Sequence, residues 1–281
     1  MGAGSEEEEE VGEFKMKLKQ LEKIGEGIRF SIEGVDHVFA NTLRRMIAEE
    51  VPVMAIDEVE FHKNDSLLYD EVLAHRLSLV PILTDLKSYN LKEGCRCNGK
   101  GCQNCQLKIS LNMKGPCSVY AKDLKFKDKK IRAVYPDMLI VKLMEKQELE
   151  FVATAILGQG KHHSKFSPGL SYFQKYPVIN IDQSKFTQNM AELCVEKCPT
   201  NVYEISGNKL KVTDETKCTL CMACMDVCKT RLVDVQGEDN KFIFVLESWG
   251  QLKPKEIIEQ AIKIFNDKLE NFRKEILSIK K

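Results

Sequence analysis

The chain reads Cys218-Thr219-Leu220-Cys221-Met222-Ala223-Cys224-Met225-Asp226-Val227-Cys228 at the place where its local fold is decided. The first three cysteines are three residues apart, a spacing at which three thiolates can hold one iron–sulfur cluster. The fourth cysteine of such a run ligates a different cluster. A further ligand must therefore come from elsewhere, and Cys198, directly before Pro199, is the cysteine that the pattern supplies. We predict one [4Fe–4S] cluster, or a [3Fe–4S] form after loss of one iron, on Cys198, Cys218, Cys221 and Cys224.

The region around this run contains an internal repeat. Cys194-x3-Cys198 is followed by two short apolar segments, 202–205 and 209–212, and Cys224-x3-Cys228 is followed by two more, 232–235 and 242–245. Each half predicts a cysteine loop, a short helix and a hairpin. This is the layout of a bacterial ferredoxin domain, which we place at residues 182–239.

The two halves of the repeat differ in their cysteines. Three and six residues before Cys194 stand Ala191 and Gln188, and neither normally ligates iron. A second cluster would thus have lost two of its four ligands and would keep only Cys194 and Cys228. We expect these two cysteines to lie close together. They form either a disulfide under oxidation or a pair of buried free thiols. The geometry of the two side chains decides between these alternatives.

A second cysteine group, Cys95-x-Cys97-x4-Cys102-x2-Cys105, lies in the glycine-rich loop 94–105. Four thiolates this close in sequence can close a tetrahedral structural zinc site. Cys95 and Cys97 are separated by one residue, whereas the usual zinc knuckle has two residues between its cysteines. The alternative is a loop that binds no metal. Eleven cysteines without a secretion signal favour metal ligation in a reducing cytoplasm over a disulfide framework. Cys117 fits neither group.

Composition limits the classes of protein to which the chain can belong. Its 281 residues are 43% hydrophobic, enough for one large or two to three ordinary domains with packed cores. Lysine plus arginine equal aspartate plus glutamate, 42 against 42, whereas nucleic-acid-gripping proteins usually carry a basic excess. We therefore expect no direct sequence-specific DNA binding. The sequence contains no run of eighteen apolar residues, so we predict no membrane span. The acidic run Glu6–Glu10 predicts a disordered tail over residues 1–12.

Periodicity predicts a mixed α+β fold. A helix over 37–50 has Asp36 as its N-cap and ends before Pro52. The most regular helix begins at Pro254, and its apolar stripe is either core or a partner surface. The other expected elements are strands at 14–20, 28–33, 53–61, 80–83, 107–113, 139–143 and 151–156, a short helix at 70–77 and an irregular loop at 158–168.

No segment indicates an active site. Gly158-x-Gly160-Lys161-His162-His163 lacks the third glycine and the following helix of a phosphate-binding loop. No carboxylate set for magnesium and no nucleophile with a paired base stands out. We predict no catalytic residue in this chain.

Several motifs together resemble those of the alpha-like subunits of multisubunit RNA polymerases. Residues 30–47, FSIEGVDHVFANTLRRMI, resemble the assembly motif of that family, and residues 70–82, DEVLAHRLSLVPI, resemble its second hallmark. The loop 158–168 is similar to the family's glycine–histidine loop, although Phe166 stands where tryptophan is common. The thiolate loop 95–105 is similar to the zinc loop of the eukaryotic members. A ferredoxin domain inserted late in the chain is typical of the archaeal form of these subunits.

The resemblance implies a domain plan and a set of partners. Residues 13–51 and 240–281 would form a discontinuous dimerisation domain, and 52–181 an inserted, mainly β domain with the zinc loop. The partner would be a small alpha-like subunit, called L in archaea, followed by the large and the small assembly subunits. The implied interface residues are Phe39, Leu43, Arg44, Arg45, Ile47, Ile257, Ala261, Ile264, Phe265 and Phe272.

The function implied by the resemblance is a non-catalytic, cytoplasmic assembly platform of DNA-directed RNA polymerase. Nucleotidyl transfer would then belong to the two largest subunits, and the cluster would be structural. The alternative is a ferredoxin-type electron-transfer protein. A third hypothesis makes the cluster a redox sensor that tunes assembly, and it is motivated by Cys194 and Cys228.

Overall fold

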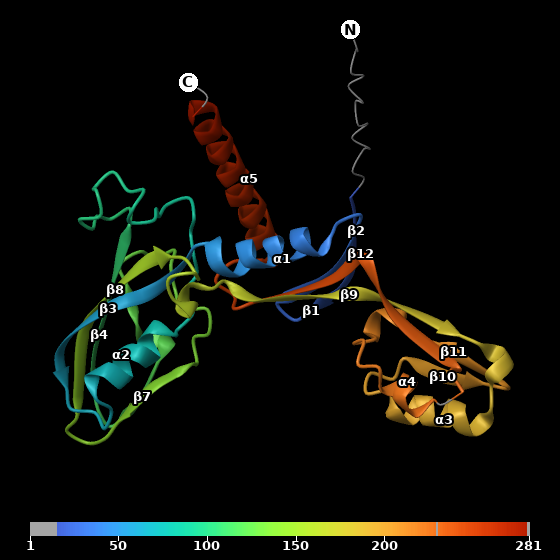
Figure 1. Cartoon of the computed structure of the whole chain (residues 1–281). Coiled ribbons are helices and arrows are strands. Elements are labelled where there is room, and N and C mark those ends of the chain that lie inside the picture. The colour runs from blue at the N-terminus through green and yellow to red at the C-terminus, as the bar shows by residue number, and fades with distance from the viewer. Residues whose placement is uncertain (1–15, 229, 280–281) are drawn as a thin grey trace, which may run out of the picture. The chain divides into compact units, whose positions relative to one another are not determined.

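The computed structural model describes residues 16–228 and 230–279, whose contacts divide them into two compact units (Figure 1). Unit 1 comprises Phe30–Ala40, Phe173–Phe244 and the residues up to Leu21. Unit 2 comprises Glu22–Arg29, Asn41–Tyr172 and Val245–Lys281. The predicted α+β class is confirmed. The acidic tail expected over residues 1–12 lies outside the described residues.

Aromatic packing forms the centre of the sheet that dominates unit 1. Phe173 stacks on Phe244 at 5.3 Å between ring centroids and meets Phe242 edge-on at 5.6 Å, and Phe30 stacks on Phe244 at 5.5 Å. The strand predicted at residues 28–33 is confirmed by a strand over Gly27–Glu33. The sheet has the order β1 (Lys17–Ile24), β2 (Gly27–Glu33), β12 (Val233–Ser248), β9 (Gly169–Ile181).

The first half of the internal repeat folds as predicted. Helix α3 (Gln188–Lys197) leads to the antiparallel hairpin of β10 (Tyr203–Ser206) and β11 (Lys209–Val212), and α3 also packs against the short helix α4 (Ala223–Val227). Single 3-10 turns at Gln183–Lys185 and Glu215–Lys217 connect these elements.

The hairpin predicted for the second half of the repeat is wrong. Residues 232–245 belong to the single strand β12, which is 16 residues long. The polar segment 237–240 has turn-like composition, but it remains extended within β12, and residues of the turn between β2 and α1 bond to its end. The Asn240 carbonyl, for example, accepts hydrogen bonds from the N–H groups of Gly34 and Val35.

Unit 2 is built on an antiparallel sheet whose interior holds Met54, Ile56 and Phe151. Helix α2 (Asp70–Ser78) covers it by burying Leu73 and Leu77 (Figure 1). The sheet has the order β3 (Val53–Asn64), β8 (Glu148–Gly158), β4 (Gln106–Lys114), β6 (Lys125–Phe126). Unit 2 also contains the strand pair β5 (Cys117–Tyr120) and β7 (Leu139–Leu143), and 3-10 turns at Ala121–Asp123 and Ser164–Phe166.

The strand predicted at 80–83 is also wrong. Ile82 is buried but makes only an isolated bridge to Ala133. Pro81 offers no N–H to a ladder, and its carbonyl accepts a single hydrogen bond from Val134. The apolar character of this segment therefore reflects burial in a loop.

The helix predicted at 37–50 changes its winding before it ends. It runs as α1 (His37–Arg45) and continues as a π-helical turn, Met46–Glu50, closed by a hydrogen bond from the N–H of Val51 to the Met46 carbonyl. Asp36 caps its start, as predicted, by accepting from the N–H of Phe39 at 2.8 Å. Helix α5 (Pro254–Ile279) begins at Pro254, as predicted, and packs against the π turn. None of the described helices is long and apolar enough to cross a membrane.

Candidate metal centres and assembly surface

Three of the four predicted cluster ligands lie in one apolar core in unit 1. Cys218 and Cys224 are buried in it, and half-buried Cys198 packs against it. Cys198 directly follows α3, Cys218 follows a 3-10 turn, and Cys224 lies in α4, so the secondary structure around each cysteine fixes its backbone. Cys221 is the exposed member, and both of its neighbours have left-handed backbones, Leu220 at φ 56° and Met222 at φ 62°.

Hydrogen-bond donors already point at three of these sulfurs. The N–H of Val202 donates to Cys198 Sγ at 3.4 Å, and the N–H of Leu220 donates to Cys218 Sγ at 3.5 Å. The Tyr203 hydroxyl donates to Cys224 Sγ at 3.2 Å. Donors of this kind stabilise the negative charge of cluster thiolates and tune the cluster's potential. The donor set therefore fits an iron–sulfur cluster.

The titration of these thiols also fits a metal centre. Burial raises the pKa of Cys218 and of Cys224, and the nearby thiols Cys198 and Cys221 raise that of Cys224 further. Without a cation to compensate them, these groups stay protonated in the apolar core. A metal cluster supplies that positive charge and displaces the protons.

Cys194 and Cys228 lie buried in the same core as free thiols. Burial, followed by the charge and hydrogen bond of Cys228, raises the pKa of Cys194 to about 12. Burial alone would raise the pKa of Cys228 too, but hydrogen bonds from Thr230 and from the N–H of Leu232 outweigh it and lower that pKa. The two cysteines are thus close neighbours, and a disulfide between them stays a prediction.

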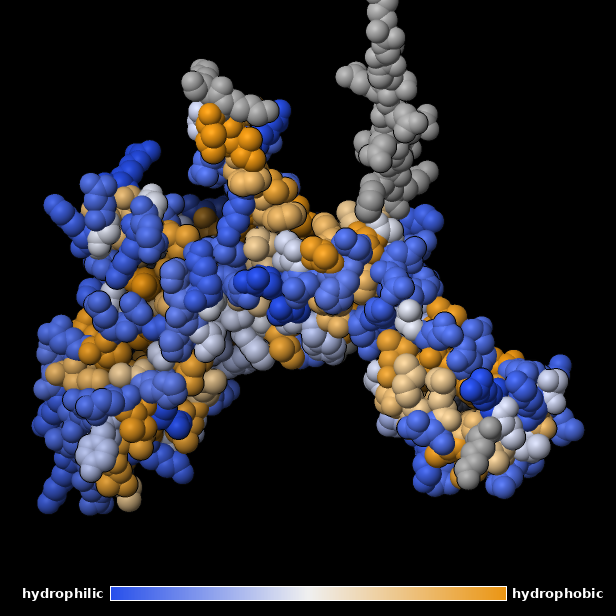
Figure 2. Space-filling view, in the orientation of Figure 1, coloured by the Kyte–Doolittle hydropathy of each residue, from blue (hydrophilic) through white to orange (hydrophobic). Residues whose placement is uncertain are grey.

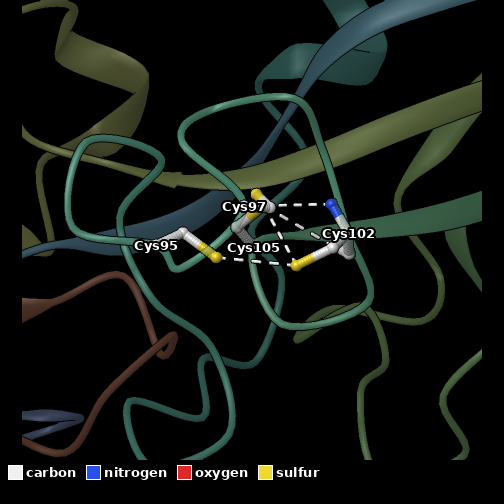
Figure 3. A group of neighbouring side chains, drawn as sticks. All are labelled: Cys95, Cys97, Cys102 and Cys105. Atoms are coloured by element: carbon white, nitrogen blue, oxygen red, sulfur yellow. Dashed lines mark hydrogen bonds between the residues drawn. The ribbon is translucent and has the colours of Figure 1, made fainter.

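The four cysteines of the thiolate loop in unit 2 converge as the sequence predicts (Figure 3). Their sulfurs all lie within 4.8 Å of one another. The Sγ–Sγ distances are 3.5 Å for Cys95–Cys102, 3.6 Å for Cys97–Cys105 and 3.8 Å for Cys102–Cys105. A tetrahedron with Zn–S bonds of about 2.3 Å has edges of about 3.8 Å. These side chains therefore fit a tetrahedral zinc ion.

The backbone of the thiolate loop and the pKa values of its thiols also fit a bound zinc ion. The N–H of Cys102 donates to Cys105 Sγ at 3.2 Å, and Gly101 has a φ of 87° that favours glycine. Hydrogen bonds from the thiols of Cys95 and Cys105 lower the pKa of Cys97 to about 6. Burial, with the neighbouring sulfurs, raises that of Cys105 to about 12. Cys97 therefore loses its proton easily, and a bound cation would displace the proton that Cys105 holds.

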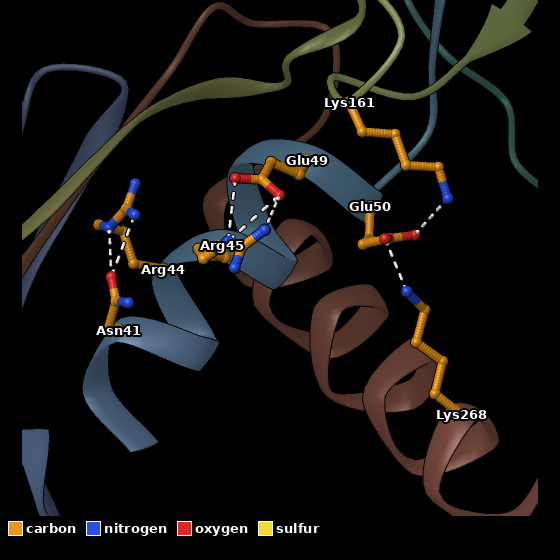
Figure 4. A network of polar contacts seen from close by, with 7 residues as sticks. All are labelled: Asn41, Arg44, Arg45, Glu49, Glu50, Lys161 and Lys268. Atoms are coloured by element: carbon orange, nitrogen blue, oxygen red, sulfur yellow. Dashed lines mark hydrogen bonds and ion pairs between the residues drawn. The ribbon is translucent and has the colours of Figure 1, made fainter. Parts of the chain in front are cut away.

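A buried carboxylate network, which the sequence did not reveal, joins three segments of unit 2 (Figure 4). Glu50 is only 7% exposed. It accepts hydrogen bonds from Lys268 Nζ at 2.6 Å, Lys161 Nζ at 3.1 Å and Gln159 Nε2 at 3.2 Å. Glu50 thereby ties the π turn to helix α5 and to the loop 158–168. No local pattern predicts this set, because its members are far apart in sequence.

Close packing against the π turn explains why position 160 of the loop 158–168 is a glycine. A Cβ at this position would come within 2.0 Å of the Ala48 carbonyl oxygen. The N–H of Lys161 also donates to the Glu49 carbonyl at 3.1 Å. The loop therefore docks its backbone directly on the π turn. Neighbouring His163 caps the following 3-10 turn through Nδ1, which accepts from the N–H of Lys165.

Replacing Glu50 with glutamine should destabilise unit 2 by about 2 kcal/mol, since hydrogen bonds to charged groups contribute about 1.5–3 kcal/mol. Burial raises the pKa of Glu50, but hydrogen bonds from Lys268 and Lys161 outweigh it, so its folded pKa lies below the usual value. The stabilisation is therefore present above the unfolded pKa of about 4.3 and is lost as pH falls through the folded pKa. Urea unfolding at several pH values measures both effects.

The exposed residue Glu259 on α5 offers the matched control for this measurement. Glu259→Gln should change stability by less than about 0.5 kcal/mol. Equal effects of Glu50→Gln and Glu259→Gln, or an effect of Glu50→Gln that persists undiminished in acid, would contradict the role of the network.

The predicted interface residues divide into two groups by burial. Leu43, Ile47, Ile257 and Ala261 are buried within this chain, so their side chains pack in its own core. Arg44 binds Asn41 Oδ1 through Nε and Nη2, and Arg45 pairs with Glu49 at 3.0 Å (Figure 4). The members left at least partly exposed are Phe39, Arg44, Arg45, Ile264, Phe265 and Phe272.

Helix α5 has two separate stripes. The inner one, Ile257, Ala261, Ile264 and Lys268, faces the chain itself, because its first two residues are fully buried and Lys268 pairs with Glu50. Figure 2 shows apolar surface over the outer part of the helix. An outer apolar stripe follows alternating steps of four and three residues: Ile258, Ile262, Phe265, Leu269, Phe272, Ile276 and Ile279. Phe272 is 62% exposed and Ile279 is 82% exposed.

Comparison with known proteins gives two family matches and a consistent set of relatives. A model described as the RNA polymerase Rpb3/RpoA insert domain matches residues 54–187, and a 4Fe-4S binding domain model matches residues 211–232. The chain is 39% identical to DNA-directed RNA polymerase subunit Rpo3 of Methanosphaera stadtmanae, covering 91% of this chain and 97% of the relative. It is 35% identical to subunit Rpo3 of Archaeoglobus fulgidus, covering 94% and 98%, and 34% identical to that of Pyrococcus furiosus, covering 93% and 97%.

Proposed function

This chain belongs to the archaeal DNA-directed RNA polymerase subunit Rpo3 family, and on that premise we propose that it is a non-catalytic assembly platform. It pairs with a small alpha-like subunit, the one called L in archaea, and the heterodimer then recruits the large catalytic subunits and the small assembly subunits. We assign no catalytic residue to this chain and leave nucleotidyl transfer to the two largest subunits.

The outer stripe of α5 is the observation that carries this proposal. Alternating steps of four and three residues are the a/d pattern of a coiled-coil seam, in which each side chain inserts between residues of a facing helix. Exposed apolar rows of this length mark interaction surfaces. The inner stripe is already used by the chain's own core, so the outer one is available to a partner helix. The interface residues proposed from the outer stripe are therefore Phe265 and Phe272, supported by Leu269 and Ile276.

Co-expression with the small subunit tests the proposal. Leu269→Glu with Phe272→Glu should lower the yield of the co-purified heterodimer at least tenfold, because two charges would be buried in the seam. Asn271→Glu with Ser278→Glu adds the same charge to exposed positions of α5 outside the stripe and should leave the yield unchanged. Circular dichroism checks that both variants keep their helix content. Equal heterodimer yields from the two variants would refute the seam.

We propose that the iron–sulfur cluster on Cys198, Cys218, Cys221 and Cys224 is structural, and that the thiolate loop of Cys95, Cys97, Cys102 and Cys105 holds zinc. When bound, each group supplies positive charge that compensates the buried thiolates. The exposure of Cys221 supports the alternative function, a ferredoxin-type electron carrier, since it brings one corner of the cluster to the surface. Replacing the cluster ligands distinguishes a structural cluster from one that transfers electrons.

A further inference from the structure

The balanced charge of the whole chain conceals a strongly basic region. Residues 92–132 contain eleven lysines and arginines but only three aspartates and glutamates, whereas the complete chain has 42 of each class. Even if the four loop thiolates and a zinc ion contribute two negative charges between them, this region keeps a large positive excess. The region lies entirely in unit 2.

Part of this excess gathers around one cavity of about 820 Å³, which we call the lysine cavity. Lys108 of β4 and Lys127, Lys129 and Lys130 of the segment after β6 line it. All four lysine side chains are exposed to solvent. Gln103 and Asn104 of the thiolate loop also line the cavity, and their side chains carry neutral amide groups. The cavity thus offers four cations and several hydrogen-bonding groups to one ligand.

Hydrogen bonds hold the lysine-bearing wall in shape. The N–H of Lys127 donates to the Lys108 carbonyl at 3.1 Å, which fastens the segment after β6 to β4. Asp128 is the one acidic residue among the lining residues, and its two oxygens accept from the Tyr89 hydroxyl at 3.1 Å and from the N–H of Lys130 at 2.9 Å. Asp128 therefore fixes the turn. Lys108 Nζ donates to Thr154 Oγ1 at 2.7 Å, so Lys127, Lys129 and Lys130 are the lysines that we assign to the ligand.

The part of the lining that the thiolate loop contributes is fixed as well. The N–H of Asn90 donates to the Asn104 carbonyl at 2.7 Å, and the N–H of Gln106 donates to the Cys102 carbonyl at 3.0 Å. The Gln106 side chain lies where a Cβ on Gly101 would come within 2.5 Å of its Oε1. The cavity is therefore framed by ordered backbone on both sides.

We propose that the lysine cavity binds the phosphate backbone of a nucleic-acid strand without sequence preference. Lysine acts as a compact point charge toward phosphate, and side-chain amides commonly donate to phosphate and sugar oxygens. The forked guanidinium that favours bidentate carboxylate recognition does not occur among the lining residues, so an acidic peptide fits less well. Contacts of this type bind the backbone and carry no base information. The site is thus compatible with the expected lack of sequence-specific DNA binding.

Fluorescence anisotropy with the full chain and labelled single-stranded DNA or RNA tests this. Lys127→Gln, Lys129→Gln and Lys130→Gln combined should weaken binding at least tenfold. They should also reduce the slope of log K against log salt by about 2, since each phosphate contact on a single strand contributes about 0.7. The control Lys142→Gln, Lys209→Gln and Lys211→Gln removes the same charge from exposed positions outside the cavity and should leave affinity and slope near those of the unchanged protein.

Each remaining outcome decides the proposal. A preference for DNA or for RNA identifies the source of the phosphate and supports the site. If both triple variants weaken nucleic-acid binding equally, only the overall charge matters, and the proposal is overturned. Competition by poly-glutamate as strong as that by unlabelled oligonucleotide assigns the cavity to an acidic protein partner instead. If the triple variant loses its fold by circular dichroism, the single change Lys129→Glu provides the same test, with a smaller expected loss of affinity.

Discussion

Replacing Cys218, Cys221 and Cys224 with serine is expected to unfold residues 182–239 and leave the sheet of unit 2 folded. Two of these cysteines are buried in a small core with Val202 and Leu210. A core in a domain of this size rarely supplies more than about 3–5 kcal/mol, so loss of the cluster should exceed the stability that the rest provides. Iron and sulfide content, circular dichroism and limited proteolysis of anaerobically purified protein measure the result.

The consequences should reach beyond the cysteine loop. Gln174 Nε2 on β9 donates to the Cys218 carbonyl at 2.9 Å, and the Tyr176 hydroxyl donates to Glu215 at 2.9 Å. Gly237 of β12 packs beside Leu220, where a Cβ would come within 3.3 Å of its side chain. The cluster loop therefore braces two strands of the sheet in unit 1, and its loss should increase proteolysis of β9.

Two single variants sharpen this prediction. Cys221→Ser removes only the exposed ligand, so we expect a folded protein with a [3Fe–4S] signal in EPR spectra. Cys117→Ser alters a cysteine outside both metal groups and should keep the full iron content. A triple-serine variant that remains protease-resistant, joins the small subunit and supports transcription would refute the structural role. That outcome would favour electron transfer or a vestigial cluster.

Replacing Cys102 and Cys105 with serine should abolish binding of one zinc ion per chain and disorder the loop 94–105. Structural zinc contributes on the order of 10 kcal/mol to the folding of small thiolate sites, because the metal compensates charges that the loop cannot otherwise bury. Cys105 and Cys95 are both buried, so zinc-free protein would have to bury these two thiols without a metal to bind them. Elemental analysis and the absorption of the cobalt-substituted protein measure occupancy and tetrahedral thiolate geometry.

The pH dependence of the zinc site follows from its thiols. Protons and metal compete for the same sulfurs, so zinc affinity should fall as pH falls. Cys97, whose pKa is lowered to about 6, should keep its negative charge to a lower pH than Cys95 and Cys105, whose pKa values are raised. Cys117→Ser again serves as control and should retain its zinc. Protein that binds no zinc from zinc-supplemented medium, yet keeps the loop protease-resistant, would show that the loop folds without metal.

Both candidate metal centres could be predicted from sequence because metal ligation is largely local. Cys218, Cys221 and Cys224 lie within one short loop, where covalent spacing restricts how far apart their sulfurs can lie. The thiolate loop converges for the same reason, aided by the left-handed backbone at Gly101. The predicted fourth cluster ligand, Cys198, is remote in sequence, and its role was indicated by the proline that follows it and by its place in the ferredoxin pattern.

The elements predicted from local signals were also mostly found. A first-turn proline marks the start of α5, and an aspartate N-cap marks the start of α1. The failures, at 80–83 and at 232–245, occur where the strand partner decides the outcome. An apolar segment containing Pro81 became a loop, and a polar segment ending at Asn240 stayed extended in β12, where the N–H groups of Gly34 and Val35 bond to the Asn240 carbonyl.

The sequence by itself predicted the two cysteine sets and determined the α+β class and the apolar character of α5, because each depends mainly on local spacing. Only the tertiary structure decided which stripe of α5 is buried, since Ile257 and Phe272 are both apolar and differ in what packs against them. It also brought Glu50 to Lys161 and Lys268, and it arranged the dispersed lysines around one cavity. Burial and long-range charge pairing depend on which distant segments meet, and local spacing carries no record of that.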